Sequence, residues 1–169
     1  MDKTTWTEAD FENLGWHDNH VHGLSIQDGE YAGKLVLDLD YICEWLCGTD
    51  RRCSFMLAPA DLVFRDVTEL RINIEYKSIA VAPISIGEIR REIIVRTERY
   101  TECRWQILFN FPQGEISFQS PGFAQVLRAL PIHKKQQFLT EDERIQLCAA
   151  EQGVGPDGSP AAPARRSKP

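Results

Sequence analysis

The sequence has 169 residues, of which 43% are hydrophobic and 26% charged, values that are ordinary for a globular domain. The formal net charge of −6 argues against a nucleic-acid-binding protein, which normally carries a basic surface. No apolar run approaches the roughly 20 residues of a membrane-spanning helix, and the first residues lack the pattern of a secretory signal. We therefore expect a cytoplasmic protein with neither nucleic acid nor membrane as a partner.

The cysteines indicate reduced thiols. There are five, and an odd number without an export signal predicts free thiols rather than a disulfide framework. Cys43, Cys47 and Cys53 lie close in sequence, but their spacing is not that of a CxxC zinc site. We expect the cysteines to be small buried core residues.

The first part of the chain predicts a helical turn followed by a β-hairpin. Residues 7–14 could form a short turn with Thr7 as the cap and Asp10 at the capping-box position. Residues 21–26 read as a strand, and 27–30 as a turn. In the next strand, residues 35–41, every second residue is apolar, so Asp38 and Asp40 should point away from the core.

The middle of the chain continues as short strands. Pro59 should stop a strand at residues 54–57 because it cannot donate to a ladder. Pro112-Gln113-Gly114 predicts the turn of a hairpin, and Pro131 should end the β region. The remaining strand-like runs are residues 67–77, 79–86, 89–95, 103–111, 116–118 and 123–129.

The end of the chain predicts one helix and a tail. Thr140 and Glu143 form a capping box ahead of a short acidic helix. Residues 151–169 are poor in hydrophobic residues and should be disordered. The prediction is a single mainly β domain over residues 1–150. It is an antiparallel meander of about seven or eight strands, forming a barrel or folded-over sheet, with short N- and C-terminal helices.

The first hairpin holds the polar residues that suggest a site. Val21 and Leu24 both look like core residues, yet three positions apart they would face opposite sides of a regular strand. Gly23 therefore suggests a bulge. With that bulge, the side chains of four residues could form one patch on the hairpin face, joined at the bulge by His17 or His22. The four are Asp18, His20, Asp38 and Asp40.

Two chemical interpretations of this patch remain open beside the plain one of a solvated strand face. Imidazoles and carboxylates are ligands for zinc, manganese or iron, so His17, Asp18, His20, His22, Asp38 and Asp40 are candidate ligands of a divalent metal. A metal-dependent hydrolase would follow from such a site. Alternatively, Asp18, His20, Asp38 and Asp40 contact a protein partner. Catalytic signatures such as GxSxG, a P-loop or HExxH are absent, so no catalytic residue is assigned.

The same stretches resemble an uncharacterised family of small bacterial β-proteins. The likeness rests on Trp16-His17-Asp18 with Val21, on residues 37–42 with Trp45, on residues 58–64, and on residues 105–131. The opening His-Asp is also similar to some polymorphic-toxin immunity proteins. The resemblance implies a compact bacterial β-protein and carries no activity.

These observations favour a non-enzymatic binding or interaction protein, immunity-like in one version, over the metal-dependent hydrolase. The acidic charge suits a basic partner. A third hypothesis is a carrier that holds an apolar ligand in a barrel mouth beside Trp45 or Trp105.

Overall fold

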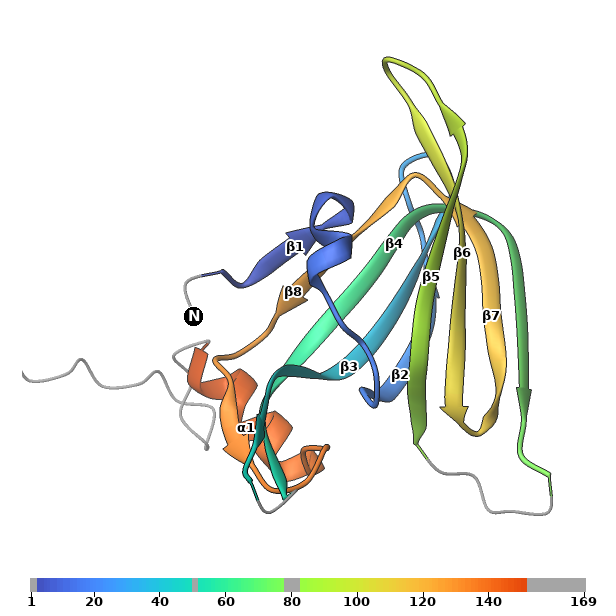
Figure 1. Ribbon diagram of the computed structural model, residues 1–169. Helices are drawn as coiled ribbons and strands as arrows, with labels where there is room; N and C mark the ends of the chain where they lie inside the picture. The colour runs from blue at the N-terminus through green and yellow to red at the C-terminus, as the bar shows by residue number, and fades with distance from the viewer. Residues whose placement is uncertain (1–2, 50–51, 78–82, 152–169) are drawn as a thin grey trace, which may run out of the picture.

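The computed structural model describes residues 3–49, 52–77 and 83–151, and these form one antiparallel β-sheet with two short helices (Figure 1). The predicted mainly β class is confirmed. The tail beyond residue 151 and the first half of the 79–86 run, residues 79–82, lie outside the described residues. The elements in chain order are β1 (Thr5–Thr7), the 3₁₀ helix η1 (Glu8–Asn13), β2 (His20–Gln27), β3 (Gly33–Cys47), β4 (Cys53–Glu75), β5 (Ile84–Arg96), β6 (Thr101–Phe111), β7 (Gln113–Ser120), β8 (Gly122–Leu127), β9 (Ile132–Lys134) and α1 (Glu141–Glu151).

The sheet closes on itself into a ring that is not a regular barrel. Its strand order is β1-β8-β4-β3-β2-β5-β6-β7, and β7 also pairs with β4. The contact between β2 and β5 consists of only two residue pairs, His20 with Ser85 and Val21 with Ile84. The ladder is short because β2 begins at His20 and β5 at Ile84, so the two strands overlap at their first residues. The expected meander is also interrupted, because β8 returns to lie between β1 and β4 (Figure 1).

The long strand β4 corrects the prediction that Pro59 stops a strand. Pro59 pairs with Asp40 on β3 and lies inside β4. On the other side of β4, Ala60 pairs with β8 and Leu57 pairs with β9, so Pro59 lies where the neighbouring strand changes. Because Pro59 belongs to neither of those two short ladders, its missing N–H breaks no hydrogen bond in them, and the strand continues.

Two residues with positive φ mark where β4 changes its neighbour again. Asp66 has φ 50° and Glu69 has φ 52°, and the register with β7 shifts between Thr68 and Arg71. Up to Arg65 the strand pairs with β8, and from Thr68 onward it pairs with β7. One strand therefore contributes to both sides of the ring, and the strand-like run predicted at residues 67–77 is the part that pairs with β7.

The core contains a cluster of aromatic rings among aliphatic side chains. Trp105 is fully buried, and its ring contacts those of Phe11, Phe64 and Phe123 at centroid distances of 5.1 to 5.7 Å. Such edge-on packing leaves no room for a ligand beside Trp105. The carrier hypothesis is therefore wrong for that site. Trp45 lies outside this core, on the distal part of β3.

The two predicted helices are present, and the end of the β region lies later than expected. Thr7 donates its amide to Asp10 (3.0 Å) at the start of η1, and Thr140 donates its amide to Glu143 (2.9 Å) at the start of α1. After Pro131 a further short strand, β9, pairs with β4, so the prediction that Pro131 ends the β region is wrong. Among the described residues, no helix has the length and apolar character needed to cross a membrane.

Candidate functional site

The predicted bulge in the first hairpin is present. The pairing of β2 with β3 shifts between Val21 and Gly23, which leaves His22 as the extra residue. The bulge brings the His22 ring to the Asp40 side of the sheet, where its Nε2 lies 2.7 Å from Asp40 Oδ2. Leu35, Leu37 and Leu39 fill the opposite, core side of β3, as their alternation predicted.

Asp40 is buried rather than exposed. Its side chain has no accessible surface, because residues 137–144, here called the docking segment, lie over it. The Leu139 amide donates to Asp40 Oδ2 at 2.7 Å, and the Arg144 guanidinium donates to Asp40 Oδ1 and to the Leu39 carbonyl. Arg144 is itself 8% exposed. Because a buried carboxylate requires a paired charge, this contact fixes α1 against β3.

Asp38 lies at the edge of the same network. Its carboxylate accepts hydrogen bonds from both Arg144 and Arg128. Directly across the sheet from it is Asp61 on β4, and Arg128 Nε lies 3.6 Å from Asp61 Oδ1. Burial raises the pKa of the Asp61 carboxyl, Arg128 lowers it, and Asp38 raises it further. Arg128 therefore lies against two like charges on neighbouring strands.

The docking segment also contacts Asp18 and His20. Gln137 donates from its side chain to Asp18 Oδ2 (3.1 Å), and its carbonyl lies 3.4 Å from His20 Nδ1. The Phe138 ring meets the His20 ring at 5.5 Å. Asp18 adopts φ 63° and accepts a further hydrogen bond from Asn110. By contrast, the His17 side chain is largely exposed, and its Nδ1 lies 3.2 Å from Asp18 Oδ2.

Most of the predicted residues thus lie on one face of the hairpin, but the docking segment packs on this face, so it is not an open acidic surface. The prediction that Asp40 faces a partner is therefore wrong. Among the described residues, no three His, Cys, Asp or Glu side chains are arranged to hold a metal ion. The carboxylates of Asp38 and Asp40 are paired with arginines instead, and the divalent-metal interpretation gains no support.

Sequence reasoning missed Arg128, Gln137 and Arg144, which complete this network. The sequence does single out Arg144, because it is the one basic residue of an otherwise acidic helix. A basic residue on the solvent-exposed face of that helix would give the same pattern, so the pattern alone does not predict a buried ion pair. Arg128 and Gln137 stand in irregular segments with no periodicity. Nothing in the sequence separates them from ordinary surface residues.

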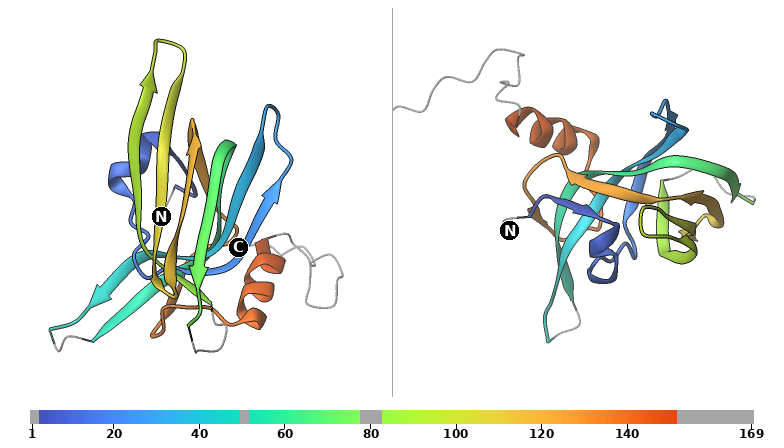
Figure 2. Two further views of the ribbon diagram at one scale, coloured as in Figure 1. Left: turned by 90° about the vertical axis from the view of Figure 1, so that its right-hand side faces the viewer. Right: turned by 90° about the horizontal axis from the view of Figure 1, so that it is seen from above.

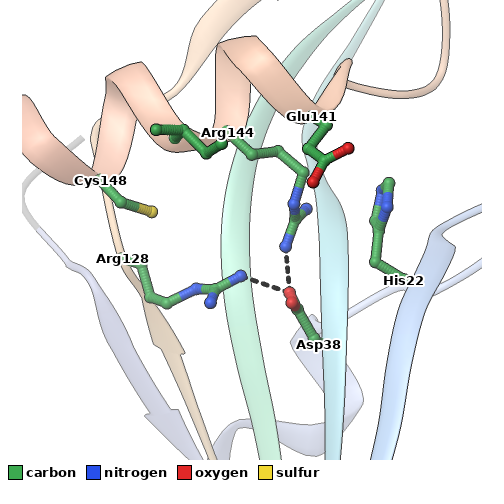
Figure 3. Close-up of a pocket in the computed structure, with 7 residues that line it drawn as sticks. His22, Asp38, Arg128, Glu141, Arg144 and Cys148 are labelled. Carbon is green, nitrogen blue, oxygen red and sulfur yellow. Dashed lines mark hydrogen bonds and ion pairs between the residues drawn. The ribbon is translucent and has the colours of Figure 1, made fainter. Parts of the chain in front are cut away.

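A polar pocket lies between α1 and the hairpin, beside this network (Figure 3). Its volume is about 520 Å³, within the range of small-molecule sites. The residues that line it come from β2, β3, α1 and the segment after β8. They are His22, Asp38, Arg128, Glu141, Arg144, Ile145 and Cys148.

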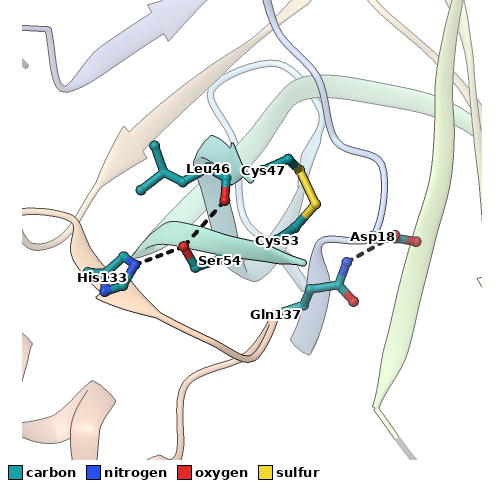
Figure 4. The surroundings of a disulfide bond; sticks show 7 residues. All are labelled: Asp18, Leu46, Cys47, Cys53, Ser54, His133 and Gln137. Atoms are coloured by element: carbon teal, nitrogen blue, oxygen red, sulfur yellow. Dashed lines mark hydrogen bonds between the residues drawn. A yellow bond between two sulfur atoms is a disulfide. The ribbon is translucent and has the colours of Figure 1, made fainter. Parts of the chain in front are cut away.

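The second notable surface is the distal part of the β3–β4 hairpin, here called the arm (residues 43–47 and 53–56). The arm projects away from the rest of the sheet in both views of Figure 2. Its last residue pair, Cys47 with Cys53, forms a disulfide (Figure 4). The prediction that all cysteines are reduced core thiols is therefore wrong. The hairpin register places these two residues directly opposite each other, a pairing that sequence spacing alone does not reveal.

Apolar side chains remain exposed on the arm. Trp45 is 43% and Leu46 is 37% exposed. The Trp45 ring packs edge-on against Phe55 at 5.0 Å, which holds it in place. On the Leu46 side, Ser54 donates to the Leu46 carbonyl and lies 2.9 Å from His133 Nε2 (Figure 4). The arm is thus a braced hairpin with large apolar groups on its surface.

Comparisons with known proteins give no relative: no family model, no curated protein and no solved structure matches this chain. The resemblance to small bacterial β-proteins stays a prediction.

Proposed function

We propose that this chain is a non-enzymatic binding protein that contacts a protein partner through the arm. The observation that carries the proposal is the exposure of Trp45 and Leu46 on a projecting hairpin closed by the Cys47–Cys53 disulfide. Consecutive strand residues point to opposite faces, so Trp45 and Leu46 present apolar surface on both sides of the arm. A hairpin with two apolar faces suits insertion into a groove of the partner.

The bracing of the arm favours binding. Tryptophan is among the residues that contribute most to interface affinity, and a side chain held before binding loses less entropy on association. Phe55 holds Trp45, and the disulfide joins the two strands at their last pair. The net charge of −6 adds long-range attraction for a basic partner, although Asp40 itself makes no contact with it.

An immunity-like protein, which binds and blocks a toxin, is one specific form of this proposal. It fits a small protein that presents one rigid recognition element, and its partner would be a basic enzyme. The cytoplasmic location belongs to the same proposal. In that compartment glutathione and thioredoxin reduce most disulfides, so the Cys47–Cys53 bond would have to persist against them.

The test is affinity capture from the source cells with three versions of the full chain. The arm variant combines Trp45→Ala with Leu46→Ser. The control variant combines Ile26→Ser with Tyr31→Ser, which removes two exposed apolar groups, 64% and 84% exposed, in or next to the β2–β3 hairpin. Both variants should keep the circular dichroism spectrum of the wild type.

We expect a partner that the wild type and the control variant capture equally and that binds the arm variant at least about 30-fold more weakly, the effect of losing roughly 2 kcal/mol at one anchor. Equal capture by all three versions would show that the arm is not the binding surface. Failure of the wild type to enrich any protein would count against a stable protein partner.

A further inference from the structure

The polar pocket beside α1 has a charge pattern that the arm proposal does not use. Two carboxylates, Asp38 and Glu141, and two guanidinium groups, Arg128 and Arg144, line it. In Figure 3, Arg128 and Glu141 lie on opposite sides of the Asp38–Arg144 pair. The pocket therefore has a cationic side, an anionic side and a neutral centre in which the charges already pair.

The two outer groups retain binding capacity. Arg128 Nη2 donates to Asp38 and its buried Nε lies 3.6 Å from Asp61 Oδ1, while its Nη1 makes no hydrogen bond with a described residue. Glu141 is exposed and makes neither a hydrogen bond nor an ion pair with another described residue. By contrast, both terminal nitrogens of Arg144 are already engaged, since they donate to Asp40, Asp38 and the Leu39 carbonyl.

We propose that this pocket binds a small zwitterion of the amino-acid or dipeptide class, with its carboxylate at Arg128 and its ammonium group at Glu141. A planar guanidinium group is suited to a carboxylate, and an ionised carboxylate accepts hydrogen bonds from an ammonium group. A ligand with a single charge would meet a like charge at the other end of the pocket. The pocket therefore favours a ligand that carries both a carboxylate and an ammonium group over a ligand that carries one of them.

The remaining lining residues fit the middle of such a ligand. Ile145 and Cys148 supply apolar surface from the helix, and the volume of about 520 Å³ accommodates a dipeptide with a side chain of moderate size. Because Asp40 and Arg144 fix α1 against the hairpin, the wall of the pocket that α1 provides is held in place.

The experiment is a titration of the full chain with leucine and with glycyl-leucine, followed by amide chemical shifts of residues 141–148. N-acetyl-leucine and leucine amide serve as probes that lack one charge each. We expect saturable shifts with at least one zwitterion, and an affinity at least about tenfold lower for each blocked compound, equal to about 1.4 kcal/mol.

Two variants connect this selectivity to the pocket. Glu141→Gln should weaken zwitterion binding about tenfold and should not weaken N-acetyl-leucine binding, since that compound has no ammonium group for Glu141 to contact and its carboxylate is repelled by Glu141. Asp142→Asn removes the same charge from the same helical turn, outside the pocket, and should change neither affinity. The arm variant should bind the zwitterion as the wild type does, so this proposal and the arm proposal fail separately.

Three results would overturn the proposal. The first is the absence of saturable shifts with both zwitterions up to about 10 mM, a concentration that detects weak binding. The second is equal affinity for blocked and unblocked compounds. The third is an equal effect of Glu141→Gln on leucine and on N-acetyl-leucine, which would assign the loss to a change in α1 rather than to a lost contact.

Discussion

The carboxylate of Asp40 on β3 and the guanidinium of Arg144 on α1 form a buried ion pair across 104 residues of sequence. Neither side chain can leave this site without stranding the charge of the other. The pair therefore determines where the docking segment and α1 lie on the sheet. The polar pocket depends on the same contact, since one of its walls is α1.

Removing one member of this pair should destabilise the protein strongly. Asp40→Asn removes the buried counter-charge of Arg144, which keeps only its ion pair with the half-buried Asp38, and we expect the free energy of unfolding to fall by about 3 kcal/mol. Urea denaturation followed by circular dichroism measures this. The double variant Asp40→Leu with Arg144→Met should recover at least half of the loss, because no unpaired charge remains.

Asp142→Asn is the control for that measurement. Asp142 is exposed on the first turn of α1 and should change the free energy of unfolding by less than about 0.5 kcal/mol. A loss below about 1 kcal/mol for Asp40→Asn would show that the pair does not hold α1 in place.

The contact of Gln137 with Asp18 should limit local opening of the docking segment. Gln137→Ala removes a hydrogen bond worth about 0.5–1.5 kcal/mol and should speed hydrogen exchange at the Leu139 amide, which donates to Asp40. Gln136→Ala, at the exposed neighbouring position, is the matched control and should leave that rate unchanged. Identical exchange rates in the two variants would contradict the role given to Gln137.

The pH dependence of stability should report on Asp61. Burial raises the pKa of its carboxyl in the folded protein above its ordinary value of 3.8, so the folded state holds this proton more tightly than the unfolded state. The wild type then loses stability as pH rises from 3.8 through the raised pKa, because the Asp61 carboxyl gives up its proton. The Asp61→Asn variant does not show this loss, because asparagine has no proton to release in this range. The difference in free energy of unfolding, variant minus wild type, should increase over that window, and a flat or falling difference would contradict the argument.

Thiol titration should distinguish the two kinds of cysteine. Of the five cysteines, Cys43, Cys103 and Cys148 are free. Denatured protein should show three thiols before reduction and five after it. In the native protein, burial raises the pKa of Cys43 to about 12 and also raises that of Cys103, so both should react with iodoacetamide far more slowly than in denatured protein. Five thiols without reduction would contradict the Cys47–Cys53 disulfide.

The local structure of this protein could be predicted from its sequence because local patterns determine it. The alternation of Leu35, Leu37 and Leu39 fixed which side of β3 is buried, and Gly23 indicated the bulge that turns His22 toward Asp40. The capping residues Thr7 and Thr140 likewise marked where the two helices begin. In each case the physical cause lies within a few residues, in side-chain period, backbone freedom or a capping hydrogen bond.

What only the tertiary structure decided is what those side chains face. The same alternation that turned Asp40 away from the core could not reveal that Arg144 lies over it, since the contact joins segments with no shared periodicity. The register that places Cys47 opposite Cys53, and the change of neighbour that lets β4 continue through Pro59, likewise depend on strands distant in sequence. The direction of a side chain is set by its own strand, but its exposure is set by what packs against that strand, and here this is the docking segment.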